Sequence, residues 1–316
     1  MEKLAIIGAG IAGLRAAQLL APYGNVSVFE KSRGVAGRMS TRYSGDYEFD
    51  HGAQYFTVKT NAFADFLSPY VISGQVTSWS PKALPESKSL KYIATPRMNS
   101  LCKAMAKPLD ITLDTQVASA KYDGGGWTLT DADGANLGIF DALIVAVPSA
   151  QARNILSDDV PQAIEALSHI ANFTLMVGLS GMWSGAWDAI RPDSDVIGWA
   201  AVNSAKPGRN IDHTSLVIQS RNDWAEQHKD ADRDWVRAQM TAAFKGMTGL
   251  DVSTAKILML HRWRYANVYT SLRKDIYADP KRNLIIAGDG CLGGRVESAW
   301  QSGNAAGLTV KGWMSK

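Results

Sequence analysis

A glycine-rich turn between a predicted strand and a predicted helix constrains this chain more than any other feature. Leu4–Ile7 is a short apolar run, typical of a buried parallel strand, and Gly8-Ala9-Gly10-Ile11-Ala12-Gly13 follows it directly. Leu14–Ala21 is predicted to be a helix and Val26–Phe29 a second strand. A strand, turn, helix and strand within about thirty residues have the size of a βαβ crossover. The sequence therefore predicts a parallel sheet that starts with this unit.

The turn matches the G-x-G-x-x-G spacing of dinucleotide-binding sites. In such a turn the first glycine permits the tight bend, the second lets the backbone approach a pyrophosphate, and the third allows close packing of helix on strand. The first N–H groups of the helix have no intrahelical partner and favour an anion. Glu30 closes the second strand, where its carboxylate can accept hydrogen bonds from ribose hydroxyls and would repel a 2′-phosphate. The turn alone leaves FAD and NAD open.

The next segment separates these two cofactors. Arg33-Gly34-Val35-Ala36-Gly37-Arg38 places two arginines, whose planar forks suit diphosphate oxygens, shortly after Glu30. This segment resembles the second signature of the flavin amine oxidase superfamily. Asp50-His51-Gly52-Ala53-Gln54-Tyr55-Phe56 resembles the D-x-G-A-Q-Y-F stretch of bacterial renalase-like flavoproteins, in which the loop passes near the flavin ring. The resemblance continues at residues 95–99, 142–148, 261–266 and 288–290, and so covers nearly the whole chain.

The C-terminal part of the sequence resembles the same superfamily. Residues 285–289 form a buried-strand pattern that ends in Gly288-Asp289, and the resemblance implies that Asp289 holds the ribityl or pyrophosphate part of FAD. A helix is predicted over Glu297–Trp313, and its first N–H groups can face the side of the flavin that becomes negative on reduction. Small residues form one stripe of this helix, which predicts close packing on the N-terminal unit: Ala299, Gly303, Ala306 and Gly307.

The resemblance implies noncovalent FAD, because the cysteine motif of covalent amine oxidases is absent around Cys291. Val117 is expected to end a strand and to place its backbone against the adenine. The full set of expected FAD-binding residues is Gly8, Gly10, Ile11, Ala12, Gly13, Glu30, Lys31, Arg33, Gly37, Arg38, Met39, Gly52, Ala53, Gln54, Tyr55, Phe56, Val117, Gly288, Asp289, Val296, Glu297 and Ala299.

Nucleotide-type elements lie at both ends of the chain and in its middle, which predicts an α/β fold with a discontinuous Rossmann-like FAD-binding domain. The expected bounds of this domain are 1–57, 96–150 and 282–316. Residues 58–95 and 151–281 are expected to form an inserted α+β substrate domain on a mostly antiparallel sheet. The elements expected around and within this domain are strands at 111–117, 118–122, 127–130, 140–147, 173–179, 196–202, 215–220 and 254–261, a helix at 232–244, and breaks at Pro69, Pro81 and Pro85.

The renalase resemblance implies a specific reaction. Such enzymes take a hydride from 2- or 6-dihydro-NAD(P), return NAD(P)⁺, and pass the electrons through FAD to O₂, giving H₂O₂. Hydride transfer needs a donor carbon held about 3–3.5 Å from its acceptor, and the flavin carries the redox chemistry itself. Two alternatives stay open: a flavin-dependent small-molecule amine oxidase, and a noncatalytic FAD-binding or redox-sensing protein. Against an amine oxidase, we find no clear aromatic pair that would form an amine cage.

Substrate residues are expected in the inserted domain. Strand alternation places His261 and Trp263 on one face and Arg262 and Arg264 on the other, and we favour the first pair, with Gln54, as the groups that position the substrate beside the flavin. His51 flanks the same loop. An anionic dinucleotide also calls for arginines and aromatic surfaces, for which the candidates are Arg221, Arg262, Arg264, Trp199, Trp263 and Tyr265.

Composition limits the remaining function classes. The formal net charge is +3 without long runs of either sign, which argues against a nucleic-acid-binding tail. Cys102 and Cys291 are far apart and outside metal-like spacing, so neither a disulfide scaffold nor a metal site is expected. No signal peptide and no apolar stretch of about 20 residues is visible. We expect a cytoplasmic enzyme, a monomer or weak dimer, whose partners are O₂ and a small dinucleotide or amine.

Overall fold

The computed structural model describes residues 3–84 and 89–314, and its contacts divide the chain into two compact units, each built from separate segments. Unit 1 comprises Met1–Arg38, Cys102–His169 and Val268–Lys316, and unit 2 comprises Met39–Leu101 and Ile170–Asn267. Residues 39–57 and 96–101 thus belong to unit 2, and residues 151–169 and 268–281 belong to unit 1. Pro85, one of the expected breaks, lies outside the described residues.

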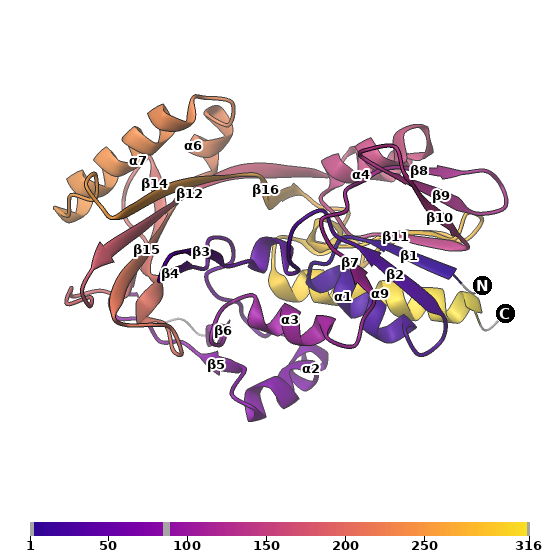
Figure 1. Cartoon of the computed structure of the whole chain (residues 1–316), viewed down its shortest axis with the longest axis horizontal. Helices are drawn as coiled ribbons and strands as arrows, with labels where there is room; N and C mark the ends of the chain where they lie inside the picture. Colours follow the sequence, from indigo (N-terminus) through magenta and orange to yellow (C-terminus); the bar gives the residue numbers. More distant parts are fainter. Residues whose placement is uncertain (1–2, 85–88, 315–316) are drawn as a thin grey trace. The chain divides into compact units, whose positions relative to one another are not determined.

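Unit 1 contains a six-stranded sheet in the order β17-β18-β11-β1-β2-β7 (Figure 1). Its strands are β1 (Lys3–Ile7), β2 (Asn25–Phe29), β7 (Ile111–Thr112), β11 (Ala142–Val145), β17 (Tyr277–Asp279) and β18 (Leu284–Ile286). β1 pairs in parallel with β2 and β11, which sets Ile7 opposite Phe29 and Val145, while β17 is an antiparallel edge strand. The predicted Rossmann-like fold is confirmed.

Two long helices of unit 1, α1 (Ile11–Leu20) and α9 (Val296–Met314), lie side by side in Figure 1. The stripe of small residues explains their approach. A Cβ atom on Gly303 would lie 2.1 Å from the Ala12 carbonyl oxygen, and one on Gly307 would lie 2.9 Å from the Leu19 Cβ. The predicted close packing of the C-terminal helix on the N-terminal unit is therefore confirmed.

The rest of unit 1 is a three-stranded antiparallel sheet with short helices. These elements are β8 (Val117–Tyr122), β9 (Trp127–Asp131), β10 (Asn136–Phe140), α4 (Ser149–Leu156), η2 (Ser157–Asp159), α5 (Gln162–Glu165), α8 (Asp289–Leu292) and η1 (Gly37–Met39), whose last residue belongs to unit 2. Trp127 and Leu129 are fully buried and belong to the same core as Leu143 and Val145 of the parallel sheet. Burying each such side chain stabilises the fold by roughly 1.5–3 kcal/mol.

Unit 2 is built on a five-stranded sheet in the order β13-β14-β15-β12-β16. Its strands are β12 (Ser168–Ser180), β13 (Ala189–Ile190), β14 (Ile197–Val202), β15 (His213–Ser220) and β16 (Ile257–Thr270), and the ends of β12 and β16 extend into unit 1. The β13–β14, β14–β15 and β12–β15 pairs are antiparallel, as the sequence predicted for the inserted domain. The other elements are β3 (Arg42–Ser44), β4 (Tyr47–Phe49), α2 (Asn61–Ile72), β5 (Val76–Ser78), β6 (Tyr92–Ala94), η3 (Asn203–Ala205), α6 (Asn222–Gln227) and α7 (Arg233–Thr248). Helix α3 (Ser100–Ala106) begins in unit 2 and continues in unit 1 from Cys102.

The two faces of this sheet have different covers. On one face, apolar residues of α7 that include Met240 and Phe244 share a core with Phe173 and Leu175. The opposite face carries Met176 and Val217, which pack against Tyr47 and Phe49 of the β3–β4 hairpin. This division follows from strand alternation, because successive side chains of β12 point to opposite faces. The hairpin brings the segment that follows it, residues 50–56, onto this second face.

Several local expectations were wrong. The first helix begins at Ile11, directly after Gly10, and not at Leu14. The strand expected over 111–117 is interrupted, because Asp114 takes a positive φ of 52°. Val117 consequently begins β8 and does not end a strand. Pro69 lies inside α2 and does not break it. Proline has no N–H group to donate to the carbonyl of Asp65, but Asp65 is exposed, so water can solvate that carbonyl. The Gly- and Arg-rich stretch after Glu30 leads into the β3–β4 hairpin, where the sequence predicted no strand.

Among residues 3–84 and 89–314, no helix combines the length and the apolar character that a bilayer crossing requires.

Candidate functional site

The glycine turn of unit 1 has the geometry of a dinucleotide site. A Cβ atom on Gly13 would lie 1.9 Å from the Gly8 carbonyl oxygen, so only glycine lets the helix approach the turn this closely. A Cβ atom on Gly10 would meet no atom within 4 Å, which leaves open space at the start of α1. The first intrahelical hydrogen bond runs from the Leu14 N–H to the Gly10 carbonyl at 3.0 Å. The preceding N–H groups therefore lie before the helical ladder, where an anion can accept from them.

Glu30 is buried at the end of β2 and is held by backbone donors. One carboxylate oxygen accepts from the Ala9 N–H at 2.9 Å, and the other accepts from the Ser32 N–H at 2.9 Å. A carboxylate has about four acceptor sites, so both oxygens keep capacity for further donors. The carboxylate is thus fixed beside the glycine turn and fits the two hydroxyls of a ribose.

The segment after Glu30 folds back onto the glycine turn. The Ala36 N–H donates to the Ala9 carbonyl at 2.9 Å, and a Cβ atom on Gly37 would lie 3.7 Å from the Gly10 Cα. Arg38 comes directly after Gly37 and is half-buried. Arg33 and Lys31 are exposed. Of the two predicted arginines, Arg38 is the one that the fold holds in place.

Arg38 forms a bidentate ion pair with Asp289, with nitrogen–oxygen distances of 2.8 and 2.6 Å. His169 lies on the other side of the same carboxylate, with its Nε2 atom 4.0 Å away. Burial would raise the pKa of Asp289, but Arg38 and His169 outweigh it and hold that pKa below the ordinary value. The adjacent Gly288 N–H donates to the Ser302 hydroxyl of α9 at 2.8 Å. A charged aspartate is therefore fixed at the start of α8, shortly after β18.

The remaining predicted FAD residues of unit 1 lie in less distinctive surroundings. Val117 is buried at the start of β8, Val296 and Ala299 lie in the first turn of α9, and Glu297 is buried there as well. Cys291 is buried, and its thiol lies 3.5 Å from the Ile286 carbonyl. Burial raises the pKa of Cys291 to about 11, so it is an uncharged thiol at neutral pH. Taken together, the open turn, Glu30 and the Arg38–Asp289 pair fit the adenosine, diphosphate and ribityl groups of FAD.

In unit 2, the segment Asp50–Phe56 is anchored by a buried charge cluster. Asp50 is fully buried, with Arg209 Nη2 at 2.7 Å and Lys206 Nζ at 3.4 Å from one oxygen. Its other oxygen accepts from the Thr41 hydroxyl at 2.7 Å and the Met98 N–H at 3.0 Å. Burial acts to raise the pKa of Asp50, but the two cations outweigh it and lower that pKa to about 2. Burial lowers the pKa of Lys206 to about 8.

A row of side chains across the sheet holds the same segment. The strand register aligns Trp199 of β14 with Gln219 of β15, and Gln219 with Thr174 of β12. The Gln219 amide donates to the Gly52 carbonyl at 2.8 Å, and the Thr174 hydroxyl donates to the His51 carbonyl at 3.0 Å. We call Trp199, Gln219, Thr174 and Trp263 the cross-strand row.

Both ends of the cross-strand row contact aromatic side chains of this segment. At one end, the rings of Tyr55 and Trp199 lie 5.7 Å apart. At the other, Trp263 of β16 donates through Nε1 to the His51 carbonyl at 2.9 Å. Residues 51–55 therefore run across four neighbouring strands, from β16 to β14.

At the β16 end of the row, three rings pack together. The His51 ring stacks on Trp263 with centroids 5.0 Å apart and meets His261 edge-on at 4.8 Å. Burial, repulsion from His261 and the charge of Arg42 lower the pKa of His51 to about 3. Burial, Arg42 and Arg233 lower the pKa of His261 to about 4. Both imidazoles are uncharged at neutral pH and form a neutral aromatic wall.

Gln54 points back into its own loop. Its amide donates to the carbonyls of Asp50 and Gly52, and its Oε1 atom accepts from Lys206 at 3.3 Å. The structure therefore gives Gln54 a bracing role toward the charge cluster. The alternation predicted for β16 is confirmed. His261 and Trp263 lie on one face of the sheet, and the Arg262 guanidinium lies on the other, 5.7 Å from the centroid of the Phe173 ring.

The arginines expected to bind an anionic substrate are committed to other partners. Arg221 pairs with Asp223 at 2.7 Å, and Arg264 pairs with Asp230 at 2.9 Å. The Arg262 guanidinium donates to the Ala231 carbonyl at 3.0 Å. The structure instead brings other residues to the segment Asp50–Phe56: Thr174, Lys206, Arg209 and Gln219. No motif marks these four, because they come from strands and loops more than a hundred residues away along the chain.

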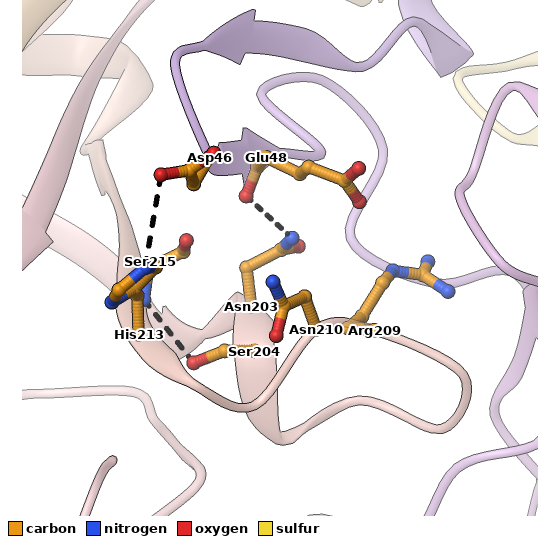
Figure 2. A pocket seen from close by; sticks show the side chains of 8 residues that line it. All are labelled: Asp46, Glu48, Asn203, Ser204, Arg209, Asn210, His213 and Ser215. Atoms are coloured by element: carbon orange, nitrogen blue, oxygen red, sulfur yellow. Dashed lines mark hydrogen bonds and ion pairs between the residues drawn. The ribbon is translucent and has the colours of Figure 1, made fainter. Parts of the chain in front are cut away.

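Figure 2 shows a small polar hollow in unit 2, near the buried charge cluster. Its lining is Asp46, Glu48, Asn203, Ser204, Arg209, Asn210, His213 and Ser215. The lining side chains largely satisfy one another: the Asn203 amide donates to the Glu48 carbonyl, and His213 lies 4.0 Å from Asp46. This hollow contains none of the predicted site residues. The cross-strand row contacts the predicted segment Asp50–Phe56 directly, so we take the row as the candidate substrate surface.

Comparison with known families decides the class of this protein. The model of the NAD(P)-binding Rossmann-like domain matches residues 6–69, and the model described as flavin containing amine oxidoreductase matches residues 82–307. The chain belongs to the flavin-containing amine oxidoreductases. It is therefore a flavin-dependent oxidoreductase, and the adenosine-binding features of unit 1 agree with FAD as its cofactor.

The individual relatives of this flavin-dependent oxidoreductase are of two kinds. One matches only a short part of its sequence, and the others share its fold at low sequence identity. A 1-hydroxycarotenoid 3,4-desaturase from Flavobacterium sp. (strain P99-3) is 48% identical over 59 residues, which are 18% of this chain and 12% of the desaturase. Cyclohexylamine oxidase from Brevibacterium oxydans IH-35A superposes with a TM-score of 0.76 at 13% identity, covering 100% of both chains. Putrescine oxidase bound to putrescine superposes with a TM-score of 0.72 at 14% identity, covering 99% of both chains. The two superpositions show a shared fold.

Proposed function

We propose that this flavin-dependent oxidoreductase is a renalase-like oxidase of 2- or 6-dihydro-NAD(P). The net reaction is dihydro-NAD(P) + O₂ + H⁺ → NAD(P)⁺ + H₂O₂. The substrate loses a hydride from its sp³ ring carbon, and O₂ receives the two electrons. The D-x-G-A-Q-Y-F segment at Asp50–Phe56 supports this assignment, since the resemblance to renalase-like flavoproteins is carried most specifically there.

When bound, FAD supplies the two-electron acceptor that also reacts with O₂. In unit 1, the first N–H groups of α1 and Arg38 would hold the diphosphate, Glu30 the adenosine ribose, and Asp289 the ribityl hydroxyls. We propose that the cofactor is noncovalent, because the Cys291 thiol is buried, uncharged and directed at the Ile286 carbonyl. The substrate is bound by unit 2, where the cross-strand row fixes residues 51–55.

The observation that carries the proposal is the packed ring cluster of His51, His261 and Trp263, whose two imidazoles are uncharged at neutral pH. Arg42 acts on both imidazoles and helps to keep them uncharged. A flat dihydropyridine ring on an anionic dinucleotide matches this environment, because its reacting ring is neutral and its phosphates are negative. A dihydropyridine also yields its hydride without loss of a proton to a base, so no side chain with a pKa near neutrality is required.

A second candidate is a small-molecule amine oxidase. The family match over residues 82–307 favours it, and two structural neighbours carry the names cyclohexylamine oxidase and putrescine oxidase. The positive field around His51 and His261 opposes it, since an ammonium substrate would enter against Arg42 and Arg233.

Anaerobic stopped-flow mixing separates the two candidates. The purified holoenzyme is mixed with 2-dihydro-NAD, 6-dihydro-NAD or a primary amine, and the visible flavin absorbance is followed. We expect bleaching by at least one dihydropyridine and none by the amine, followed by formation of one H₂O₂ per substrate when O₂ is admitted. Bleaching by the amine alone would overturn the proposal in favour of an amine oxidase.

The variant Trp263→Phe tests the ring cluster in the same assay. It keeps an aromatic ring but removes the donor to the His51 carbonyl, so the reacting ring is held less accurately. We expect the rate of flavin reduction to fall by about ten- to a hundredfold, since small misplacements of reacting groups have effects of this order. An unchanged rate would show that the cluster does not position the substrate.

A further inference from the structure

A second cluster lies at the β14 end of the cross-strand row, and it combines cations with aromatic rings. Arg191, which follows β13, lies with its guanidinium carbon 5.0 Å from the centroid of the Trp199 ring. The same guanidinium donates to the Tyr55 hydroxyl at 2.9 Å. Lys91, which precedes β6, places its Nζ atom 5.8 Å from the centroid of the Tyr55 ring. Three segments distant in sequence therefore bring two cations to one tyrosine.

These cations differ from the arginines that the sequence suggested. Within residues 3–84 and 89–314, neither Arg191 nor Lys91 forms an ion pair, whereas Arg221 and Arg264 are each paired with an aspartate. Two like charges on one ring repel each other unless an anion joins them. Trp199 is buried, and its Nε1 atom has no hydrogen-bond partner in the described part of the chain. The cluster thus offers two cations to a ligand.

We propose that Arg191, Lys91, Tyr55 and Trp199 bind the adenosine diphosphate end of the dinucleotide substrate. Guanidinium and ammonium groups recognise phosphate oxygens, and the partly exposed Tyr55 ring supplies surface for a planar base. The buried Trp199 ring supports the Arg191 guanidinium. This inference rests on the proposed function, because it assigns the second half of the same substrate.

The separation of the two clusters agrees with this assignment. Trp199 lies on β14 and Trp263 on β16, three strand steps apart in the sheet order. Neighbouring strands lie about 4.8 Å apart, so the two tryptophans are separated by about 14 Å across the sheet. Residues 51–55, which contact both, are continuous between them. A simple amine does not span this distance, whereas a dinucleotide carries two ring systems that are joined through a diphosphate.

Direct binding of ADP to the FAD-loaded full-length protein tests the site without turnover. The dinucleotide site of unit 1 is then filled, so calorimetry reports on the remaining surface. We expect saturable ADP binding, weaker binding of adenosine by at least about tenfold, and weakening of ADP binding by about tenfold in Arg191→Gln and in Lys91→Gln. Arg237→Gln, at an exposed arginine on α7 that pairs with Asp234, is the matched control and should bind ADP like the wild type.

Three outcomes would overturn the assignment: no ADP binding, equal binding of ADP and adenosine, or equal ADP affinity in Arg191→Gln, Lys91→Gln and the control. Thermal melting of each variant checks that the fold is kept. Flavin reduction by dihydro-NAD, measured on the same proteins, separates this inference from the proposed function. If Arg191→Gln and the wild type are reduced equally fast with the same KM, the proposed function is supported and the assignment of this cluster is rejected. If ADP binding depends on Arg191 but neither isomer reduces the flavin, the cluster binds ADP and the proposed function is rejected.

Discussion

The glycine turn of unit 1 and the segment Asp50–Phe56 of unit 2 are both candidate ligand-binding segments, but they are built in different ways. The turn is shaped by its own backbone and by Glu30, all within thirty residues of the chain start. The second segment is held by side chains as far away as Trp263, 212 residues from His51 in sequence. The first is thus a local steric design, whereas the second depends on tertiary packing and on buried charge.

The difference predicts how each region fails. In the glycine turn, an added methyl group should destabilise the fold where two backbone segments meet. The stability of this turn should not depend on pH in the neutral range. A site anchored by a buried ion pair tolerates changes of volume better than the loss of one charge, because the partner is then left unpaired in the interior. The predictions below test this contrast.

The largest effect is expected for Gly13→Ala. The new methyl group would lie 1.9 Å from the Gly8 carbonyl oxygen, and a backbone atom cannot move aside as a side chain can. We expect destabilisation of about 3 kcal/mol or more and purification without flavin. Chemical unfolding and the ratio of flavin to protein measure the two effects.

Gly10→Ala is the matched control, because its methyl group meets no atom within 4 Å. Stability should stay within about 1 kcal/mol of the wild type, while FAD affinity falls because the methyl group enters the space beside the first turn of α1. If Gly13→Ala kept full flavin content, the steric account of the turn would be wrong.

The next largest effect is expected for Asp50→Asn. The substitution leaves Lys206 and Arg209 buried without their common carboxylate, which costs about 3–5 kcal/mol of unfolding free energy. Lys206→Met should cost less, since the Asp50–Arg209 pair at 2.7 Å remains. Urea unfolding of the two variants compares these costs, and a smaller loss in Asp50→Asn than in Lys206→Met would contradict the role given to the aspartate.

The same cluster should impose a pH dependence. The native pKa of Asp50, about 2, lies below its ordinary value, so its contribution is present at neutral pH and is lost as the pH falls from about 4 toward 2. The native pKa of Lys206, about 8, also lies below its ordinary value of 10.5. Between about pH 8 and pH 10.5, Lys206 holds its proton more often in the unfolded chain than in the native protein. The unfolding free energy should therefore rise with pH over this range. Lys206→Met should abolish the alkaline rise and keep the acid loss.

The smallest effects are expected for Arg221→Gln and Arg264→Gln. Both arginines are exposed and paired with surface aspartates, and such pairs contribute about 0–1 kcal/mol. We expect melting temperature and KM close to wild type. A tenfold rise in KM for either variant would restore the sequence-based assignment and weaken that of Arg191.

Much of unit 1 could be predicted from the sequence, because its signals are local. The apolar run before Gly8, the spacing of the glycines and the small residues of α9 each determine one contact, and the structure shows those contacts. The errors also have local causes that sequence patterns do not carry. Val117 was misplaced because Asp114 turns the chain with a positive φ. In unit 2, the hairpin that contains Tyr47 was hidden in a Gly- and Arg-rich stretch.

Unit 2 shows where sequence reasoning ends. Alternation correctly placed His261 and Trp263 on one face of β16. It could not show that Trp199, Gln219 and Thr174 line up on neighbouring strands, because strand register is set by pairing between distant segments. For the same reason the sequence favoured Arg221 and Arg264, while Arg191 became visible only through its contacts with Trp199 and Tyr55.

The amino-acid sequence by itself therefore determined the Rossmann-like class, the glycine turn with Glu30, and the expectation of FAD. The class and the turn follow from the conformations that glycine alone permits and from a carboxylate at the end of a strand. The expectation of FAD follows from the Arg33–Arg38 segment and the resemblance that it carries. Only the tertiary structure decided which side chains hold Asp50–Phe56 and which cations gather beside Tyr55. Burial, strand register and charge pairing are properties of residues brought together by folding, and no single stretch of the sequence encodes them.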